Sequence, residues 1–236
     1  MAVPRKFSTI LSYILFFGGA LLGMFIIGSA VWGDFEAALL VRPIGAEKNL
    51  NNLRCPIFVS SEEIGEAYVW ISNPTDKPVN RTIRTHLSKY YISLIDSVDT
   101  KVSIEQGGKT RIAWPIDPDD ASYGRFYIIR VYMFSTYKTP SQEGSCGIVV
   151  IDLPFSGKQI VSYSVILSLL GMGLGFLIQS LVGNRGWDRR DKIFGFMLVL
   201  VSAGLIVSFL GWWLVGAIIV VVFVLMIGAN LVRFYD

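Results

Sequence analysis

Two cysteines, Cys55 and Cys146, are the residues of this 236-residue chain whose type and spacing most directly suggest chemistry. They are the only cysteines in the sequence, and they lie at the two ends of its one long polar region. The pair has no C-x-x-C spacing and no neighbour that would stabilise a thiolate, which indicates a structural disulfide rather than a redox centre. We therefore expect a bond between Cys55 and Cys146 that closes a folded domain.

The sequence offers little for nucleophilic or metal-assisted catalysis. Gly144-Ser145-Cys146-Gly147 is similar to the turn around a serine nucleophile, but a nucleophile needs a base within reach, and His86 is the only histidine. With both cysteines in a disulfide, no set of three or four zinc or copper ligands remains. We expect no cofactor, no metal site and no enzyme activity.

Acidic residues form two further candidate sites, at residues 62–63 and at residues 117–120 (DPDD). Glycoside hydrolysis needs two carboxylates that face each other across a cleft, and a calcium loop needs spaced oxygen ligands with a distal glutamate. Residues 117–120 are instead typical of a turn, with a loosely held calcium ion as the alternative. Asn80-Arg81-Thr82 is a glycosylation sequon, to which we assign no role.

Composition indicates a membrane protein, because 53% of the residues are hydrophobic and only 17% are charged. The net charge of +3 is too small to favour nucleic acid as a partner. Four apolar runs have a length that suits helices crossing about 30 Å of hydrocarbon. The first run could instead be a signal peptide, since Gly28-Ser29-Ala30 is similar to a cleavage site, but its length favours a retained helix.

Basic residues lie at the ends of the apolar runs, and with four crossings they all fall on one side of the membrane. The positive-inside rule assigns that side to the cytoplasm, together with both termini. The cysteine-containing region then lies outside, where a disulfide persists. We expect a multi-pass protein of the plasma (inner) membrane. Its topology determinants are Arg5, Lys6, Arg185, Arg189, Arg190, Lys192 and Arg233.

The polar region between the cysteines consists of short runs of alternating apolar and polar residues, separated by turn sequences. Such a series is typical of an antiparallel β-sandwich. The expected strands are 66–72, 79–87, 89–95, 100–105, 110–116, 124–135 and 146–153.

The order of these runs and turns over residues 57–153 resembles a known class of module. A strand, N-P-T-D-K-P, a second strand, G-G-K-T, R-I-A-W-P-I and Y-G-R-F-Y-I-I-R-V-Y follow one another. This order is similar to that of immunoglobulin-like modules of bacterial envelope proteins, the CARDB type in particular. The resemblance implies a module that binds or spaces other molecules. That class does not require the cysteine pair.

The predicted fold class is therefore membrane α+β, with four transmembrane helices and an antiparallel, immunoglobulin-like β-sandwich between the first helix and the second. The predicted segments are a cytoplasmic N-terminus 1–6, a helix 7–32, a connector 33–54, an extracytoplasmic β-sandwich 55–153, a helix 160–182, a basic cytoplasmic loop 183–192, and helices 193–210 and 213–232.

The apolar runs carry no Asp, Glu, Lys, Arg or His between their ends, which argues against a transporter or pump working alone. Their glycines are more informative. Gly19 with Gly23, and Gly171 with Gly175, have the GxxxG spacing that lets helices approach closely. These faces pack either within this bundle or against helices of other subunits.

Tyrosines that leave the sandwich core are candidate partner contacts, namely Tyr90, Tyr91, Tyr123 and Tyr137. Together these patterns favour a non-catalytic integral membrane subunit with a structural, accessory or assembly role. Its partners would be other membrane subunits or a second copy, within the lipid bilayer. The alternative is a cell-surface receptor or ligand-binding protein, and the third hypothesis is a membrane enzyme.

Overall fold

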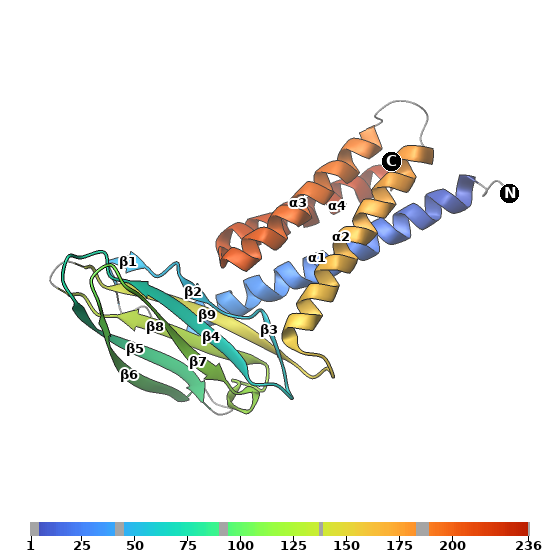
Figure 1. Ribbon diagram of the computed structural model, residues 1–236. Coiled ribbons are helices and arrows are strands. Elements are labelled where there is room, and N and C mark those ends of the chain that lie inside the picture. Colours follow the sequence, from blue (N-terminus) through green and yellow to red (C-terminus); the bar gives the residue numbers. More distant parts are fainter. Residues whose placement is uncertain (1–4, 41–44, 90–93, 137–138, 183–188, 236) are drawn as a thin grey trace. The chain divides into compact units, whose positions relative to one another are not determined.

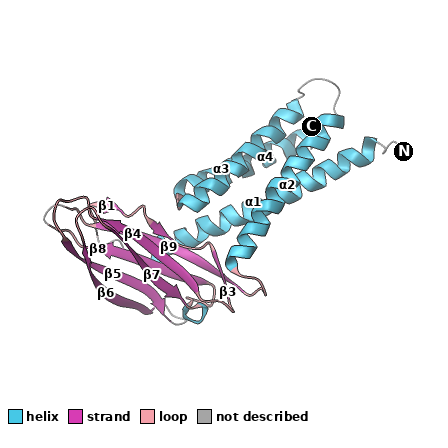
Figure 2. Ribbon diagram, viewed as in Figure 1, coloured by secondary structure: helices cyan, strands magenta, loops and turns pink. Residues whose placement is uncertain are grey.

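The computed structural model describes residues 5–40, 45–89, 94–136, 139–182 and 189–235. The chain forms two compact units, a helical unit of residues 1–31 and 161–236 and a β-unit of residues 32–160. Figure 2 shows the division, with all strands on one stretch of chain between the first and second helices. The protein is thus α+β. Its helices are α1 (Arg5–Leu40), α2 (Gly157–Val182), α3 (Arg189–Leu210) and α4 (Trp213–Tyr235).

Three stretches of helix are long and apolar enough to cross a membrane: Lys6–Leu39, Gly157–Val182 and Asp191–Leu210. A fourth apolar stretch, Trp213–Gly228 in α4, is shorter within the described part of the chain. Large apolar side chains along these helices remain exposed in a single copy. Leu181, for example, is 82% exposed.

Helix α1 continues beyond residue 32, so that the first part of the predicted connector is helical. The extension has a packing reason, because Ala37 is fully buried and contacts Ile128 of the β-unit. Helix α2 likewise begins before residue 160. A carboxylate oxygen of Glu63 accepts a hydrogen bond from the Gly157 amide at 2.5 Å, and a negative charge at a helix N-terminus is favourable.

The β-unit contains nine strands and one short 3-10 helix among the described residues, labelled in Figure 1. Of the predicted strand 89–95, the first residue ends β5 and the last two begin β6, and the residues between them lie outside the described part of the chain. The strands are β1 (Lys48–Asn49), β2 (Leu53–Arg54), β3 (Phe58–Ser60), β4 (Gly65–Ser72), β5 (Val79–Lys89), β6 (Leu94–Ile104), β7 (Lys109–Ile116), β8 (Phe126–Met133) and β9 (Gln142–Ile151).

The strands form two sheets. The larger has the order β1-β9-β8-β5-β6, with β3 also paired to β9, and the smaller has the order β2-β4-β7. Both β1 and β3 run parallel to β9, so the prediction of purely antiparallel strands is wrong. Strands β1 and β3 have two and three residues, which are too few to show an alternating pattern. Strand β2 lies between them in the sequence and pairs with β4 of the smaller sheet.

The hydrophobic core of the β-unit lies between the two sheets. Strand β4 contributes Ala67, Val69 and Ile71, and strand β8 contributes Ile129 and Val131 from the opposite sheet, all 2% exposed or less. Their spacing of two residues is the strand period, which places alternate side chains on opposite faces. The intervening residues face away from this core. On β4 they include the exposed Glu66 and Trp70, whereas on β8 Ile128 and Arg130 are buried.

Candidate functional site

Cys55 and Cys146 form a disulfide, and the chain has no free cysteine. Cys55 directly follows β2 of the smaller sheet, whereas Cys146 lies within β9 of the larger sheet. The bond closes a loop with a sequence separation of 91 residues. It therefore ties the segment that crosses between the sheets to a central part of the fold. No thiol is available for catalysis or metal binding.

His86 and Ser145, which a nucleophilic mechanism would need together, lie in one row of the larger sheet. Arg130 stands between them, because it pairs with His86 on one side and with Ser145 on the other. Two strand spacings of about 4.8 Å each exceed hydrogen-bond reach. Arg130 is buried and forms an ion pair with Glu143. The row consequently has no serine-histidine contact.

The remaining groups of this outer face are charged and aromatic. Burial lowers the pKa of His86, and the nearby Arg130 and Arg84 guanidinium groups lower it further. Arg84 donates two hydrogen bonds to Asp99 at 2.8 Å, and these hold the pKa of that carboxyl below its usual range. The Arg84 guanidinium also lies 5.3 Å from the ring centre of Phe134.

The acidic candidates have structural contacts. Glu63 accepts hydrogen bonds from the amides of Ser60 and Gly157. Asp117 precedes the 3-10 helix Pro118–Asp120 and accepts a hydrogen bond from the Asp119 amide at 3.1 Å, as expected for a turn. Among the described residues, no group of three or more His, Cys, Asp or Glu side chains could hold a metal ion.

The glycines of the two GxxxG pairs lie where α1 and α2 meet within the helical unit. A Cβ added to Gly19 would be 2.6 Å from the Ser168 carbonyl oxygen, and one added to Gly175 would be 2.7 Å from the Phe16 amide nitrogen. Gly173, between the two glycines of the second pair, has open space beside it. The crowded positions thus belong to the helix-helix contact.

Gly23 and Gly171 are crowded in the same way. A Cβ on Gly23 would lie 2.6 Å from side-chain atoms of Ser168 and Val201, and one on Gly171 would lie 3.0 Å from the Leu15 carbonyl oxygen. These glycines are packed inside one copy of the chain, so they do not present a free face to another subunit.

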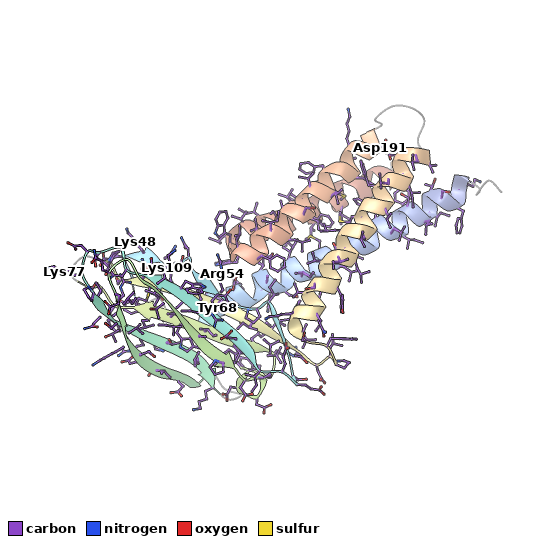
Figure 3. All side chains as sticks on the ribbon, viewed as in Figure 1. Lys48, Arg54, Tyr68, Lys77, Lys109 and Asp191 are labelled. Atoms are coloured by element: carbon purple, nitrogen blue, oxygen red, sulfur yellow. A yellow bond between two sulfur atoms is a disulfide. The ribbon has the colours of Figure 1, made fainter. Side chains whose placement is uncertain are left out.

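The predicted topology determinants lie at helix ends where the structure describes them. Arg5 begins α1, Arg189 and Arg190 begin α3, and Arg233 is near the end of α4. Arg185 lies outside the described residues. Figure 3 marks Asp191 in the first turn of α3, where a helix N-terminus favours a negative charge. Lys6 and Lys192 are exposed.

Of the four predicted tyrosine contacts, only Tyr123 falls within the described residues. Its side chain is 54% exposed, and its backbone has a positive φ of 55° in the turn before β8. Tyr90, Tyr91 and Tyr137 lie outside the described part of the chain. The predicted contact surface can therefore be followed at Tyr123 alone among the described residues.

A different aromatic surface lies on the outer face of the smaller sheet. Cross-strand register places Arg54 beside Tyr68, Trp70 beside Arg111, and Ser72 beside Lys109. We call the set Arg54, Glu66, Tyr68, Trp70, Lys109 and Arg111 the Trp70 face. Arg54, Tyr68 and Lys109 are labelled on the β-unit in Figure 3.

Contacts within the Trp70 face centre on Arg111. Its guanidinium lies 4.4 Å from the ring centre of Tyr68 and donates a hydrogen bond to Glu66 at 2.6 Å. Trp70 is 48% exposed. Sequence reasoning missed this face, although the alternation of β4 (Glu66, Tyr68, Trp70) carried the signal for it.

Comparison with known proteins gives structural likenesses at low sequence identity. No protein-family description and no curated protein sequence matches the chain. The CARDB domain of the PF1109 protein from Pyrococcus furiosus, solved in complex with di-metal ions, is 12% identical with a TM-score of 0.33. The match covers 43% of this chain and 90% of that domain.

Two larger proteins are similar over a smaller share of their length. For a β-glucosidase from Listeria innocua in complex with glucose, the identity is 15% and the TM-score 0.28, over 42% of this chain and 15% of that one. For the alkylpurine DNA glycosylase AlkC of Pseudomonas fluorescens, bound to DNA with an abasic-site analogue, the identity is 10% and the TM-score is 0.30. That match covers 42% of this chain and 30% of that one. Likeness this distant carries no argument about activity, substrate or partner.

Proposed function

We propose that this chain is a non-catalytic integral membrane subunit whose β-domain contacts other proteins outside the cytoplasm. Its four helices each cross the membrane, and both termini lie in the cytoplasm. The β-domain is an immunoglobulin-like sandwich between the first and second crossings. Its helices pack among those of other membrane subunits or of further copies of the chain.

The observation that carries this proposal is the combination of exposed apolar helices with a disulfide-closed β-unit in one chain. Side chains such as Leu181 and Leu225, 82% and 66% exposed, are stable in lipid or against other helices but not in water. The disulfide favours an oxidising compartment for the β-unit.

Membrane topology can be tested by labelling introduced cysteines with a membrane-impermeant maleimide, because both natural cysteines are bonded. Lys101→Cys in β6 and Lys192→Cys in α3 are a matched pair, since both positions are exposed. We expect labelling of the first in intact cells and of the second only after permeabilisation. The reverse pattern, or labelling of both, would overturn the proposed orientation.

The subunit role is tested by gentle solubilisation from the native membrane, followed by mass spectrometry of the chains that co-purify. Other proteins at a fixed ratio, or a defined multimer of this chain, would support the proposal. A monomer without partners would overturn it and favour the receptor hypothesis. Turnover of a substrate that is lost on one Ser, Asp or His substitution would favour the enzyme hypothesis instead.

A further inference from the structure

We propose that the Trp70 face binds the partner protein, and that the partner presents carboxylate side chains beside an apolar pocket. This inference rests on the proposed function, because it names the surface and the chemistry of the protein contact proposed above.

Trp70 is the first reason to choose this face. It is 48% exposed, whereas its chain neighbours Val69 and Ile71 are 0% and 2% exposed in the core. The strand period therefore directs the indole outward, and the indole takes no part in the core of the domain. Tryptophan, tyrosine and arginine are the residues most enriched among those that dominate binding energy, and this face carries all three.

The second reason is that the neighbours of Trp70 are already ordered. Arg111 contacts the Tyr68 ring and also forms an ion pair with Glu66. The side chains of Glu66, Tyr68 and Arg111 therefore hold one another in place before a partner arrives. Immobilising a long side chain on binding costs free energy, and a side chain that is held beforehand avoids much of that loss. These three side chains are thus ordered before binding and do not have to be ordered by the partner.

Charge decides the chemistry of the partner. Within the Trp70 face, the cation Arg111 already binds the carboxylate of Glu66, and Lys109 is a second cation. Lys109 is exposed at the edge strand of the sheet. Complementary charge steers and orients association, so an acidic surface fits this face. A symmetric contact between two copies would instead set the same cations against each other.

The test compares variants of the full-length protein, solubilised gently from its native membrane, by the amount of partner retained. We expect Trp70→Ala and Lys109→Glu each to reduce the retained partner by about tenfold, because one removes the apolar anchor and the other reverses a charge. Lys101→Glu is the matched control, since Lys101 is also exposed but lies on β6 of the other sheet. This variant should retain as much partner as the wild-type protein.

A photo-crosslinking residue in place of Ser72 identifies the contacted segment, with Val98 of β6 as the control position. We expect crosslinks from position 72 to a segment that contains Asp or Glu, and restored binding of Lys109→Glu when that acid is changed to Lys. Unchanged thermal unfolding of each variant verifies its fold.

Three outcomes overturn the inference and remain distinguishable. A partner that is retained equally by Trp70→Ala and Lys109→Glu overturns the face alone, and the proposed function stands. Crosslinks from position 72 to another copy of this chain, or to a segment without acids, overturn the acidic partner. If wild-type protein retains no partner and forms no multimer, the proposed function fails together with this inference.

Discussion

Gly33 of α1 and Gly147 of β9 touch backbone to backbone, 114 positions apart in the sequence. A Cβ on Gly147 would lie 1.8 Å from the Gly33 carbonyl oxygen, and one on Gly33 would lie 2.7 Å from the Gly147 carbonyl oxygen. The Asp34 carboxylate accepts a hydrogen bond from the Gly147 amide at 3.2 Å beside this contact. The last turns of α1 are therefore part of the β-unit and not a flexible linker.

We expect Gly147→Ala to destabilise the β-unit by about 1–3 kcal/mol, because backbone atoms cannot rotate away from an added methyl group. The measurement is thermal or denaturant unfolding of the full-length protein in detergent. Gly28→Ala, in the helix α1 that carries Gly33, has open space and should leave this transition unchanged. Equal unfolding of wild-type and Gly147→Ala protein would show that the contact does not hold the helix end.

Replacing Cys55 and Cys146 together by Ala should lower the stability of the β-unit without preventing membrane insertion. A loop of this length restrains the unfolded chain by about 4–5 kcal/mol in the chain-entropy account. Thermal unfolding of the purified double variant measures the loss, and membrane fractionation measures the insertion. An unchanged unfolding transition would contradict a stabilising role for the bond.

Gly175→Leu should weaken the packing of α1 against α2, with a loss of about 1–3 kcal/mol from overpacking. The added side chain would meet the Phe16 amide and the Ser12 carbonyl oxygen. Gly173→Leu is the matched control on the same helix, because nothing lies within 4 Å of its Cβ position. Melting in mild detergent distinguishes the two variants, and identical melting would count against this contact.

The contribution of His86 to the stability of the β-unit should fall as the pH drops below about 6.5, the ordinary histidine pKa. Burial and the arginines lower the folded-state pKa of His86, so the unfolded chain takes up a proton first and gains stability relative to the fold. Above that pH the imidazole is neutral in both states and has no effect. Asp99 acts in a separate pH range. Because the folded state lowers the pKa of its carboxyl, the stability that Asp99 contributes is lost only below pH 3.8, the ordinary pKa of that group.

His86→Gln measures the histidine contribution, since this is the only histidine in the chain. We expect the melting temperature of the variant to fall less than that of wild type between about pH 7 and pH 5. A parallel decline of both proteins would assign the pH dependence to other groups.

Sequence reasoning located the strands that have a long alternating pattern. Residues 79–87 and 110–116 match β5 and β7 closely, because their buried positions recur every second residue. It missed β1, β2 and β3, which have two or three residues each and owe their conformation to pairing with β9 and β4. A short segment has no pattern of its own to recognise.

The candidate sites divide in the same way. The cysteine pair and the crowded glycines could be predicted from residue type and spacing. A disulfide requires two cysteines, and a close helix contact requires residues without a side chain. The predicted tyrosines were chosen by type alone, and the structure describes only Tyr123 among them, in a turn. The pairing of Trp70 with Arg111 needed the register between β4 and β7.

By itself, the sequence determined the apolar helices, the disulfide partners and the alternating strands, because hydrophobic period and residue chemistry are local properties. Only the tertiary structure decided that β1 and β3 run parallel to β9, that α1 ends against Gly147, and that Arg54, Trp70 and Arg111 share one face. These relationships join residues from distant parts of the chain. They depend on strand register and close packing, which no local pattern encodes.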